Sequence, residues 1–251
     1  MNADSGWMDG HCHFSGLALP SEALKKMNAL QVRGAVSCGA DLASNEKALK
    51  QQKQFKNILA AVGLHPEAVL ANSESENSRC ADWIQKNVSS AVGIGEIGLD
   101  FKYADSSEKR EKQQVWFERL LKIAFESEKP VLVHSRKAVD ETIATLEKFR
   151  MKKVLIHWFD GTSEQLDRIQ NNGWLVSVGP AVLNQKKIQK IAATIELNRL
   201  VLETDSPTPF NGVLSDPSWI PLVGQKVAEL RNTAVQTIAD ETTQNLRSLL
   251  K

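Results

Sequence analysis

The side chains best suited to bind a metal ion in this sequence are its five histidines. Each falls at or just after the end of an apolar run that is expected to form a strand, and Glu96 and Asp205 occupy the same kind of position. A buried charge without a partner is costly, and a metal ion neutralises several such groups at once. The pattern therefore predicts a metal centre. Its expected ligands are His11, His13, Glu96, His134, His157 and Asp205.

The first two histidines form a His-x-His pair. Residues two apart in a strand point to the same side, so His11 and His13 are expected to face the same interior while Cys12 packs on the other side. Such a pair alone is a weak signal, because most are ordinary surface or core histidines. The pair becomes significant because four further candidate ligands, Glu96, His134, His157 and Asp205, end or follow other predicted strands.

The number of candidate ligands favours two metal ions over one. About four imidazole or carboxylate groups saturate a single tetrahedral ion, and six are expected here. A carboxylate such as Glu96 can bridge two ions, and a two-metal site activates water and clamps the leaving oxygen of a phosphoester. Mixed nitrogen and oxygen ligands suit Zn²⁺, Mn²⁺, Fe²⁺ or Co²⁺, and suit Mg²⁺ less well.

Eight short apolar runs that alternate with helical patterns must position these side chains. A series of strand and helix units predicts an α/β protein with a parallel sheet closed into a (β/α)8 TIM barrel, whose active site lies at the carboxyl ends of the strands. We expect one domain over residues 1–251, because a barrel of about this length is commonly one unit. An open doubly wound sheet is the alternative, but it usually has a glycine-rich loop after its first strand, where this chain has His-Cys-His-Phe.

The expected elements have these limits. Strands are predicted over Gly6–Asp9, Val32–Cys38, Ile58–Leu64, Ser90–Gly95, Pro130–His134, Lys153–His157, Trp174–Val178 and Leu200–Thr204. Helices are predicted over Ser21–Leu30, Ser44–Phe55, Asn77–Val88, Glu108–Ser127, Val139–Phe149, Ser163–Asn171, Gln185–Ile195 and a C-terminal region from about Ile220 to Leu250. Residues 71–79 are expected to form a polar loop.

Composition excludes several classes of protein. The net charge of +1 gives no general attraction for polyanions, so a nucleic-acid substrate would need a local site. Three cysteines without regular spacing argue against a disulfide framework and for a reducing compartment. The N-terminus lacks the pattern of a signal peptide, and no apolar run approaches the roughly 20 residues that span a bilayer. We therefore expect a cytoplasmic protein with no membrane contact.

Six motifs, in order and over nearly the whole chain, make the sequence resemble the TatD family of metal-dependent deoxyribonucleases. They are Met-Asp-Gly-His-Cys-His-Phe, Val-Gly-Leu-His-Pro-Glu, Gly-Glu-Ile-Gly-Leu-Asp-Phe, Pro-Val-Leu-Val-His-Ser-Arg-Lys-Ala, Ile-His-Trp-Phe-Asp-Gly and Leu-Glu-Thr-Asp-Ser-Pro. The resemblance implies the same six metal ligands, and it implies DNase or exonuclease activity. It also places His65 near the substrate phosphate. The segments after Leu99-Asp100-Phe101 and after Asp205 depart from the family pattern, so the metal chemistry has more support than the substrate.

Other side chains have both functional and structural interpretations. Arg136 could bind phosphate bidentately or pair on the surface with Asp140 or Glu141. Asp100 and Glu203 could orient metal ligands, or Asp100 could simply begin a loop and Glu203 pair with a basic residue. Trp158 and Phe159 could stack a base or pack within a loop. The basic cluster at residues 109–112 is expected to be a solvated helix face.

Together these observations predict a metal-dependent hydrolase that cleaves phosphodiester bonds, with DNA ends or single strands as substrate. Water would attack phosphorus in line, with Asp205 positioning that water and accepting its proton. Glu96 would bridge the metals, and His65 and Arg136 would hold the non-bridging oxygens. One alternative is an amide or ester hydrolase of small molecules on the same fold. Another is a TatD-like subunit of a multi-protein, defence-type system that does little chemistry.

Overall fold

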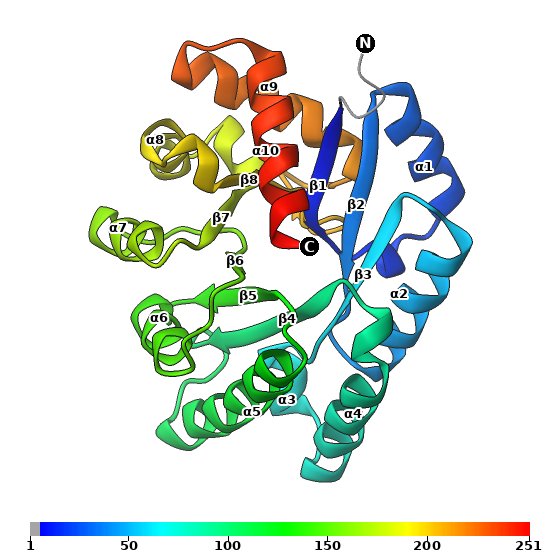
Figure 1. Ribbon diagram of the computed structural model, residues 1–251, viewed down its shortest axis with the longest axis vertical. Coiled ribbons are helices and arrows are strands. Elements are labelled where there is room, and N and C mark those ends of the chain that lie inside the picture. Colours follow the sequence, from blue (N-terminus) through cyan, green and yellow to red (C-terminus); the bar gives the residue numbers. More distant parts are fainter. Residues whose placement is uncertain (1–5) are drawn as a thin grey trace. The chain divides into compact units, whose positions relative to one another are not determined.

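The computed structural model describes residues 6–251, and this part of the chain divides into two compact units. The first unit contains the chain up to Ser37 together with His157–Leu249, and the second contains Cys38–Ile156. The 8-stranded sheet has its strands in the order of the sequence, β1 to β8 (Figure 1). Parallel strands that alternate with helices in chain order have the arrangement of a (β/α)8 barrel.

The first unit contains the beginning and the end of the strand series. Its strands are β1 (Trp7–Cys12), β2 (Val32–Cys38, whose last residue falls in the second unit), β7 (Leu175–Val178) and β8 (Leu200–Leu202), followed by the short pair β9 (Pro209–Phe210) and β10 (Val213–Leu214). Its helices are α1 (Pro20–Ala29), α7 (Ser163–Asn171), α8 (Lys186–Thr194), α9 (Ile220–Arg231) and α10 (Val235–Leu249).

The strands of this unit are buried because helices cover their outer side. Every residue of β1 is buried, and α9 and α10 pack beside β1 and β8 (Figure 1). Gly224 of α9 lies against the indole of Trp7, so closely that a Cβ atom at Gly224 would overlap the ring. The hydroxyl of Thr243 donates to the carbonyl of Gly6 at 2.9 Å, which fixes α10 to the start of β1.

The second unit contains β3 (Ile58–Val62), β4 (Gly93–Asp100), β5 (Val131–Arg136) and β6 (Val154–Ile156), which pair in parallel in that order. Its helices are α2 (Leu42–Gln54), α3 (Pro66–Ala71), α4 (Glu74–Asn87), α5 (Ser107–Glu126) and α6 (Val139–Lys148). Helix α5 lies along β4 and α6 lies beside β5 (Figure 1). All eight residues of β4 are buried, as expected for a parallel strand covered on both faces.

Several element limits differ from those expected from sequence. Strand β4 continues past Gly95 to Asp100, so Glu96 lies in its interior, at an irregularity in the pairing with β5 between Ile94 and Ile97. The C-terminal region is two helices, broken where Asn232 adopts a left-handed conformation with φ 48°. The N-terminal cap of α2 is Asp41, with Ser44 completing a capping box.

The prediction of a polar loop over residues 71–79 was wrong. Helix α3 extends to Ala71 and α4 already begins at Glu74, because Ser73 caps α4 and forms a capping box with Glu76. The polar residues that suggested a loop are therefore the exposed first turn of a helix. None of the described helices is both long enough and apolar enough to cross a membrane.

Candidate metal centre

Three side chains of the first unit converge beyond the ends of β1 and β8. The Nε2 atoms of His11 and His13 lie 3.5 and 3.4 Å from the Oδ1 atom of Asp205. The backbone amide of Asp205 donates to the carbonyl of His11 at 3.0 Å, so the chain after β8 is fixed to β1. Strand β1 ends at Cys12, so His13 lies just past it and reaches Asp205 from the following turn. Cys12 is buried and its thiol donates to the carbonyl of Val36, as the packing interpretation predicted.

His157 joins this group through His11. The two imidazoles are stacked, with ring centroids 3.9 Å apart and an angle of 9° between their planes. On its other side, the Nδ1 atom of His157 lies 3.6 Å from Oε2 of Glu203, which also accepts a hydrogen bond of 2.6 Å from Ser177. Glu203 is fully buried, and the partners described for its side chain are His157 and Ser177, not a lysine or arginine of the barrel.

Asp9 is a residue of this unit that the sequence analysis did not single out. Its carboxylate is fully buried and accepts hydrogen bonds from the amides of His11 and Thr204 and from the hydroxyl of Thr204. Burial raises the pKa of Asp9 to about 8, although these hydrogen bonds oppose the rise. Asp9 thus ties the end of β1 to the segment after β8, two residues before the first candidate ligand. The signal in the sequence was a charged residue within an apolar run.

The pKa of Asp205 shows how this group is balanced. Burial alone would raise the pKa of its carboxyl, but the hydrogen bonds of His11 and His13 and the charges of His11 and His157 hold that pKa below its usual range. Asp205 is therefore an ionised carboxylate among imidazoles. This combination of one carboxylate and nitrogen donors is a common ligand set of Zn²⁺ and similar ions.

The second unit brings together Glu96, His134 and His65. The Oε1 atom of Glu96 lies 2.7 Å from Nδ1 of His134 and 3.4 Å from Nε2 of His65. Glu96 is only 1% exposed and comes from the interior of β4. Close approach of the backbone makes the arrangement possible, because a Cβ atom at Gly98 would overlap the carbonyl of His134.

Asp100 contacts the other edge of the His134 ring, as the orienting interpretation predicted. Its Oδ2 atom lies 2.9 Å from Nε2 of His134, and the residue is buried. Burial raises the pKa of Asp100, but the hydrogen bond and charge of His134 and the charge of Arg136 lower it by more, so this carboxylate is ionised and accepts. Gln113 of α5, which the sequence analysis missed, accepts from the amide of Asp100 at 2.9 Å.

The environment of His134 fits a bound cation. A neutral imidazole has one N–H, yet both ring nitrogens of His134 face carboxylate oxygens. With a single proton, on Nε2 facing Asp100, the lone pair of Nδ1 would face Oε1 of Glu96, and either a second proton or a metal ion there would remove this repulsion. Within each unit, one set of three ligand atoms lies within 4.8 Å of one another: His11, His13 and Asp205 in the first, and His65, Glu96 and His134 in the second.

His65 has a different role from His134 according to its hydrogen bonds. It is the N-terminal cap of α3, and its Nδ1 atom accepts from the amide of Glu67 at 3.1 Å. In the neutral ring the proton then lies on Nε2, the atom that faces Glu96. A nitrogen that carries a proton donates to oxygen and does not bind a metal ion. This geometry favours the phosphate contact expected from sequence over a ligand role.

The remaining candidates occupy less central positions. Arg136 is exposed at the end of β5, in register with Asp100 of β4. Phe159 is buried, as the packing interpretation predicted, whereas Trp158 is partly exposed and adopts a positive φ of 43°. In the basic cluster, Lys109 pairs with Asp105 at 2.8 Å, consistent with a solvated helix face.

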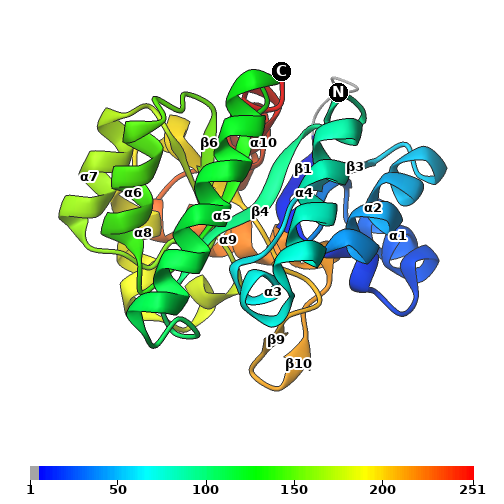
Figure 2. The ribbon, with the colours of Figure 1, turned by 90° about the horizontal axis from the view of Figure 1, so that it is seen from below.

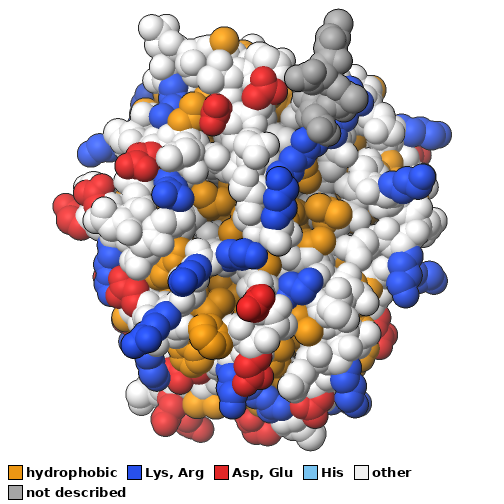
Figure 3. Space-filling model, viewed as in Figure 1, with side chains coloured by type: hydrophobic (Ala, Val, Ile, Leu, Met, Phe, Trp, Pro, Cys, Tyr) orange, Lys and Arg blue, Asp and Glu red, His pale blue; other side chains and the backbone are white. Residues whose placement is uncertain are grey.

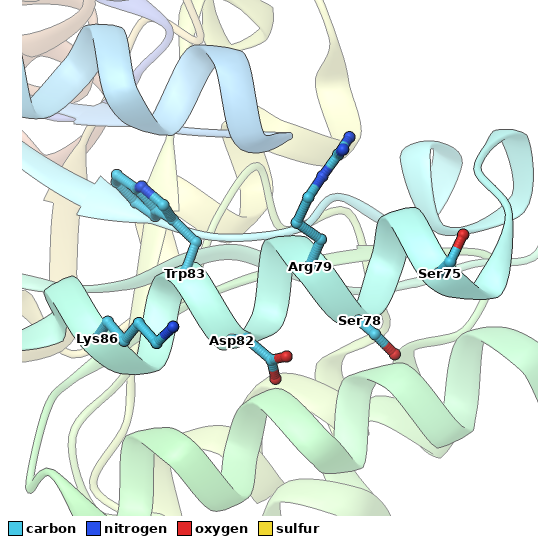
Figure 4. Close-up of a pocket in the computed structure, with 6 residues that line it drawn as sticks. All are labelled: Ser75, Ser78, Arg79, Asp82, Trp83 and Lys86. Carbon is cyan, nitrogen blue, oxygen red and sulfur yellow. The ribbon is translucent and has the colours of Figure 1, made fainter.

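A surface groove of about 440 Å³ lies along α4 (Figure 4). Its one carboxylate, Asp82, points toward α5 and pairs there with Arg119 at 2.8 Å, and its six lining residues include no histidine or cysteine. The groove is therefore not a metal site. Its lining residues are Ser75, Ser78, Arg79, Asp82, Trp83 and Lys86.

The surface shows no field of a single sign on the face drawn in Figure 3. Lys and Arg side chains lie among Asp, Glu and hydrophobic side chains, and none of the described histidines is visible on this face. This mixture agrees with the net charge of +1 and leaves any recognition of a polyanion to local groups.

Comparison with known proteins shows which family the chain belongs to. The profile of the family described as TatD related DNase matches residues 8–251. The chain belongs to the TatD family. Among curated TatD relatives, it is 28% identical to the "Uncharacterized metal-dependent hydrolase YabD" of Bacillus subtilis, over 97% of this chain and 98% of that protein. It is also 28% identical to the human "Deoxyribonuclease TATDN3", over 98% of this chain and 95% of that protein.

Solved structures of TatD proteins confirm the fold class. The crystal structure of YjjV, a TatD homologue from Escherichia coli, superposes with a TM-score of 0.87 at 25% identity and covers 97% of each chain. A TatD family hydrolase from Entamoeba histolytica gives a TM-score of 0.85 at 18% identity, over 98% of each chain. The (β/α)8 barrel predicted from the sequence is therefore correct.

Proposed function

We propose that this TatD protein is a phosphodiesterase that uses two divalent metal ions to cleave DNA at ends or in single strands. Membership of the family, and the names of relatives such as YabD, support the broader conclusion that it is a metal-dependent hydrolase. The name of the human relative TATDN3 supports DNA as the substrate. The observation that carries the proposal is the convergence of His11, His13 and Asp205, with their ligand atoms within 4.8 Å of one another.

The two units supply different proposed ligands. In the first unit these are His11, His13, His157 and Asp205, and in the second they are Glu96 and His134. The bridging role of Glu96 stays a prediction from the sequence. When bound, two divalent ions would activate water and neutralise charge on the leaving oxygen, and Zn²⁺, Mn²⁺, Fe²⁺, Co²⁺ and Mg²⁺ are all candidates.

The protein side chains would divide the remaining work. Asp205 is ionised, because histidines hold its pKa low, and can orient the attacking water and accept its proton. His65 presents Nε2–H as a donor for a non-bridging phosphate oxygen, since its Nδ1 atom is held by the amide of Glu67. Arg136, exposed at the end of β5, would bind a second such oxygen. Asp100 holds the ring of His134 in place.

A panel of substrates tests the proposal. Single-stranded DNA, bis(p-nitrophenyl) phosphate and p-nitrophenyl acetate would be incubated with the protein and added Mn²⁺, Mg²⁺ or Zn²⁺. We expect metal-dependent cleavage of the DNA and of the phosphodiester, and little cleavage of the acetate. Preference for the acetate would instead identify a carboxylic ester or amide hydrolase. Absence of turnover on all three substrates with every metal would contradict the proposal and favour a non-catalytic subunit.

A matched pair of variants separates this activity from a contaminating nuclease. Asp205→Asn removes the proposed ligand and base, whereas Asp240→Asn makes the same change at an exposed position of α10. Activity must be lost in the first variant and retained in the second. Equal DNA cleavage by both variants would show that the measured activity is not that of the proposed centre.

A further inference from the structure

The segment that follows Asp205 forms a small hairpin with exposed hydrophobic side chains. Strands β9 and β10 pair antiparallel, and Figure 2 shows them as a projecting hairpin. Its tip is Asn211–Gly212, with φ of 51° and 79°, the two positive values of a tight two-residue hairpin turn. Val213 and Leu214 are 58% and 63% exposed and are adjacent in the chain, so the hairpin presents two neighbouring hydrophobic side chains to solvent.

The hairpin carries hydrophobic groups on both faces. Phe210 is paired with Val213 and Pro209 with Leu214, and paired residues of an antiparallel ladder share a face. Successive pairs point to opposite faces. One face therefore presents Phe210 and Val213, and the other presents Pro209 and Leu214. Within a protein, one face of such a hairpin would ordinarily be packed on the core, but here Pro209, Val213 and Leu214 are all exposed.

Hydrogen bonds hold the hairpin close to the candidate ligands of its own unit. The amide of Thr208 donates to the carbonyl of Asp205 at 2.9 Å, and the amide of His13 donates to the carbonyl of Ser206 at 2.6 Å. The amide of Ser215 donates to Thr208 at 3.2 Å and closes the base of the hairpin. Four residues span at most about 14 Å, so Pro209 lies within that reach of Asp205, and Leu214 is its neighbour across the hairpin.

The side chains of the hairpin determine which part of a nucleic-acid substrate it can contact. Between Asp205 and Asp216 the chain has no charged residue, so this segment offers nothing to pair with a phosphate. Every nucleobase has a flat, uncharged face, and packing such a face on a hydrophobic side chain removes apolar surface from water. Resting on the proposed function, we propose that Val213 and Leu214, on the two faces of the hairpin, are base-contacting side chains that hold bases of a single strand beside the cleaved phosphodiester.

The test compares two matched double variants. Val213→Ser/Leu214→Ser removes the exposed hydrophobic groups of the hairpin, and Leu222→Ser/Val235→Ser makes the same two changes at partly exposed positions of α9 and α10. Binding of a fluorescent polythymidine strand would be measured by anisotropy with EDTA present, alongside a strand of the same length whose sugars carry no bases. Cleavage of both strands would be measured with metal.

We expect the hairpin variant to bind the polythymidine strand about tenfold more weakly than wild type, the effect of losing roughly two buried hydrophobic contacts. Binding of the base-free strand should not change, and neither should hydrolysis of bis(p-nitrophenyl) phosphate. The α9/α10 variant should behave as wild type in every assay. In cleavage, the preference of wild type for base-bearing strands should shrink in the hairpin variant alone.

The results distinguish failure of this inference from failure of the proposed function. If wild type cleaves DNA and the hairpin variant retains full affinity and preference for bases, the inference is wrong and the proposed function stands. If wild type cleaves the small phosphodiester but neither binds nor cleaves DNA, both the base-contacting role of the hairpin and the proposed cleavage of DNA are wrong. If light scattering shows that the hairpin variant alone changes from a dimer to a monomer, the hydrophobic hairpin is an interface with a second copy, and the base-contacting role is overturned.

Discussion

Asp100 holds the edge of the His134 imidazole opposite to the edge that faces Glu96, with Oδ2 of Asp100 2.9 Å from Nε2 of His134. The ionised carboxylate accepts a hydrogen bond from Nε2–H, so Nδ1, which faces Glu96, is the nitrogen that could bind a metal ion. Carboxylates in this position fix the tautomer and the orientation of a ligand histidine and raise its basicity.

Replacement of Asp100 by Asn should therefore weaken metal binding by about 10- to 100-fold while leaving much of the rate at saturating metal. The measurement is a titration of activity, or of heat released, with Mn²⁺. Asp105→Asn is the control, because Asp105 is exposed in the loop that follows β4 and pairs only with Lys109 among the contacts described for its side chain. Identical metal affinities for the two variants would show that Asp100 has no influence on the centre.

Loading with metal tests the ligand set as a whole. We expect about two divalent ions per chain after reconstitution with Mn²⁺ or Zn²⁺ and removal of excess metal, measured by elemental analysis. Glu96→Gln should lower this number and reduce turnover by more than about a hundredfold. Mutation of a residue that only hydrogen-bonds to a metal ligand already lowers affinity or activity by up to about that factor, and loss of a ligand should cost more. Glu128→Gln is the control at an exposed turn. Wild-type turnover by Glu96→Gln at saturating metal would remove Glu96 from the chemistry.

The sequence predicted the fold and the candidate ligands because both depend on a repeated local pattern. Each candidate ligand follows or lies within an apolar run, and this pattern alone predicted that His11, His134 and His157 lie near the ends of parallel strands. The contacts that position the ligands lack such a pattern. Ser177 meets Glu203 from 26 residues away, and Gln113 meets Asp100 from another element, so only the tertiary structure shows them.

Two missed elements did have local signals. The Asn211–Gly212 pair is a strong hairpin signal, but the flanking strands have only two residues each and no visible alternation. Helix α3 begins with Pro66 at its first position and Glu67 in its first turn, yet its six residues are too few for helical periodicity to be recognised.

The contact between Gly224 and Trp7 gives a prediction about stability. In an exposed helix, Gly→Ala stabilises by about 1 kcal/mol, but at this position the added methyl group would overlap the indole of Trp7. We expect Gly224→Ala to lower the free energy of unfolding by about 1–3 kcal/mol, the usual cost of overpacking. Urea denaturation measures it, with Gln225→Ala at an exposed position of the same helix as the control. A more stable Gly224→Ala protein would show that α9 can move away from Trp7 at little cost.

Arg136 gives the last prediction, which separates binding from catalysis. If its guanidinium contacts a phosphate oxygen equally in the ground state and the transition state, Arg136→Ala should raise KM and leave kcat nearly unchanged. The loss of a hydrogen bond to a charged group is worth about 1.5–3 kcal/mol, so KM should rise roughly tenfold to a hundredfold. Steady-state kinetics on single-stranded DNA at saturating metal give both constants.

Two further variants interpret the outcome for Arg136. Arg136→Lys keeps the charge but loses the bidentate geometry, so its KM should lie between those of wild type and Arg136→Ala. Arg79→Ala, at an exposed position of α4 in the same unit, should leave both constants unchanged. Equal losses in kcat and kcat/KM for Arg136→Ala would move this residue into transition-state stabilisation. Removal of a side chain that binds phosphate must weaken the complex with the substrate. Unchanged kinetics would therefore favour the other interpretation of Arg136, a surface ion pair with Asp140 or Glu141.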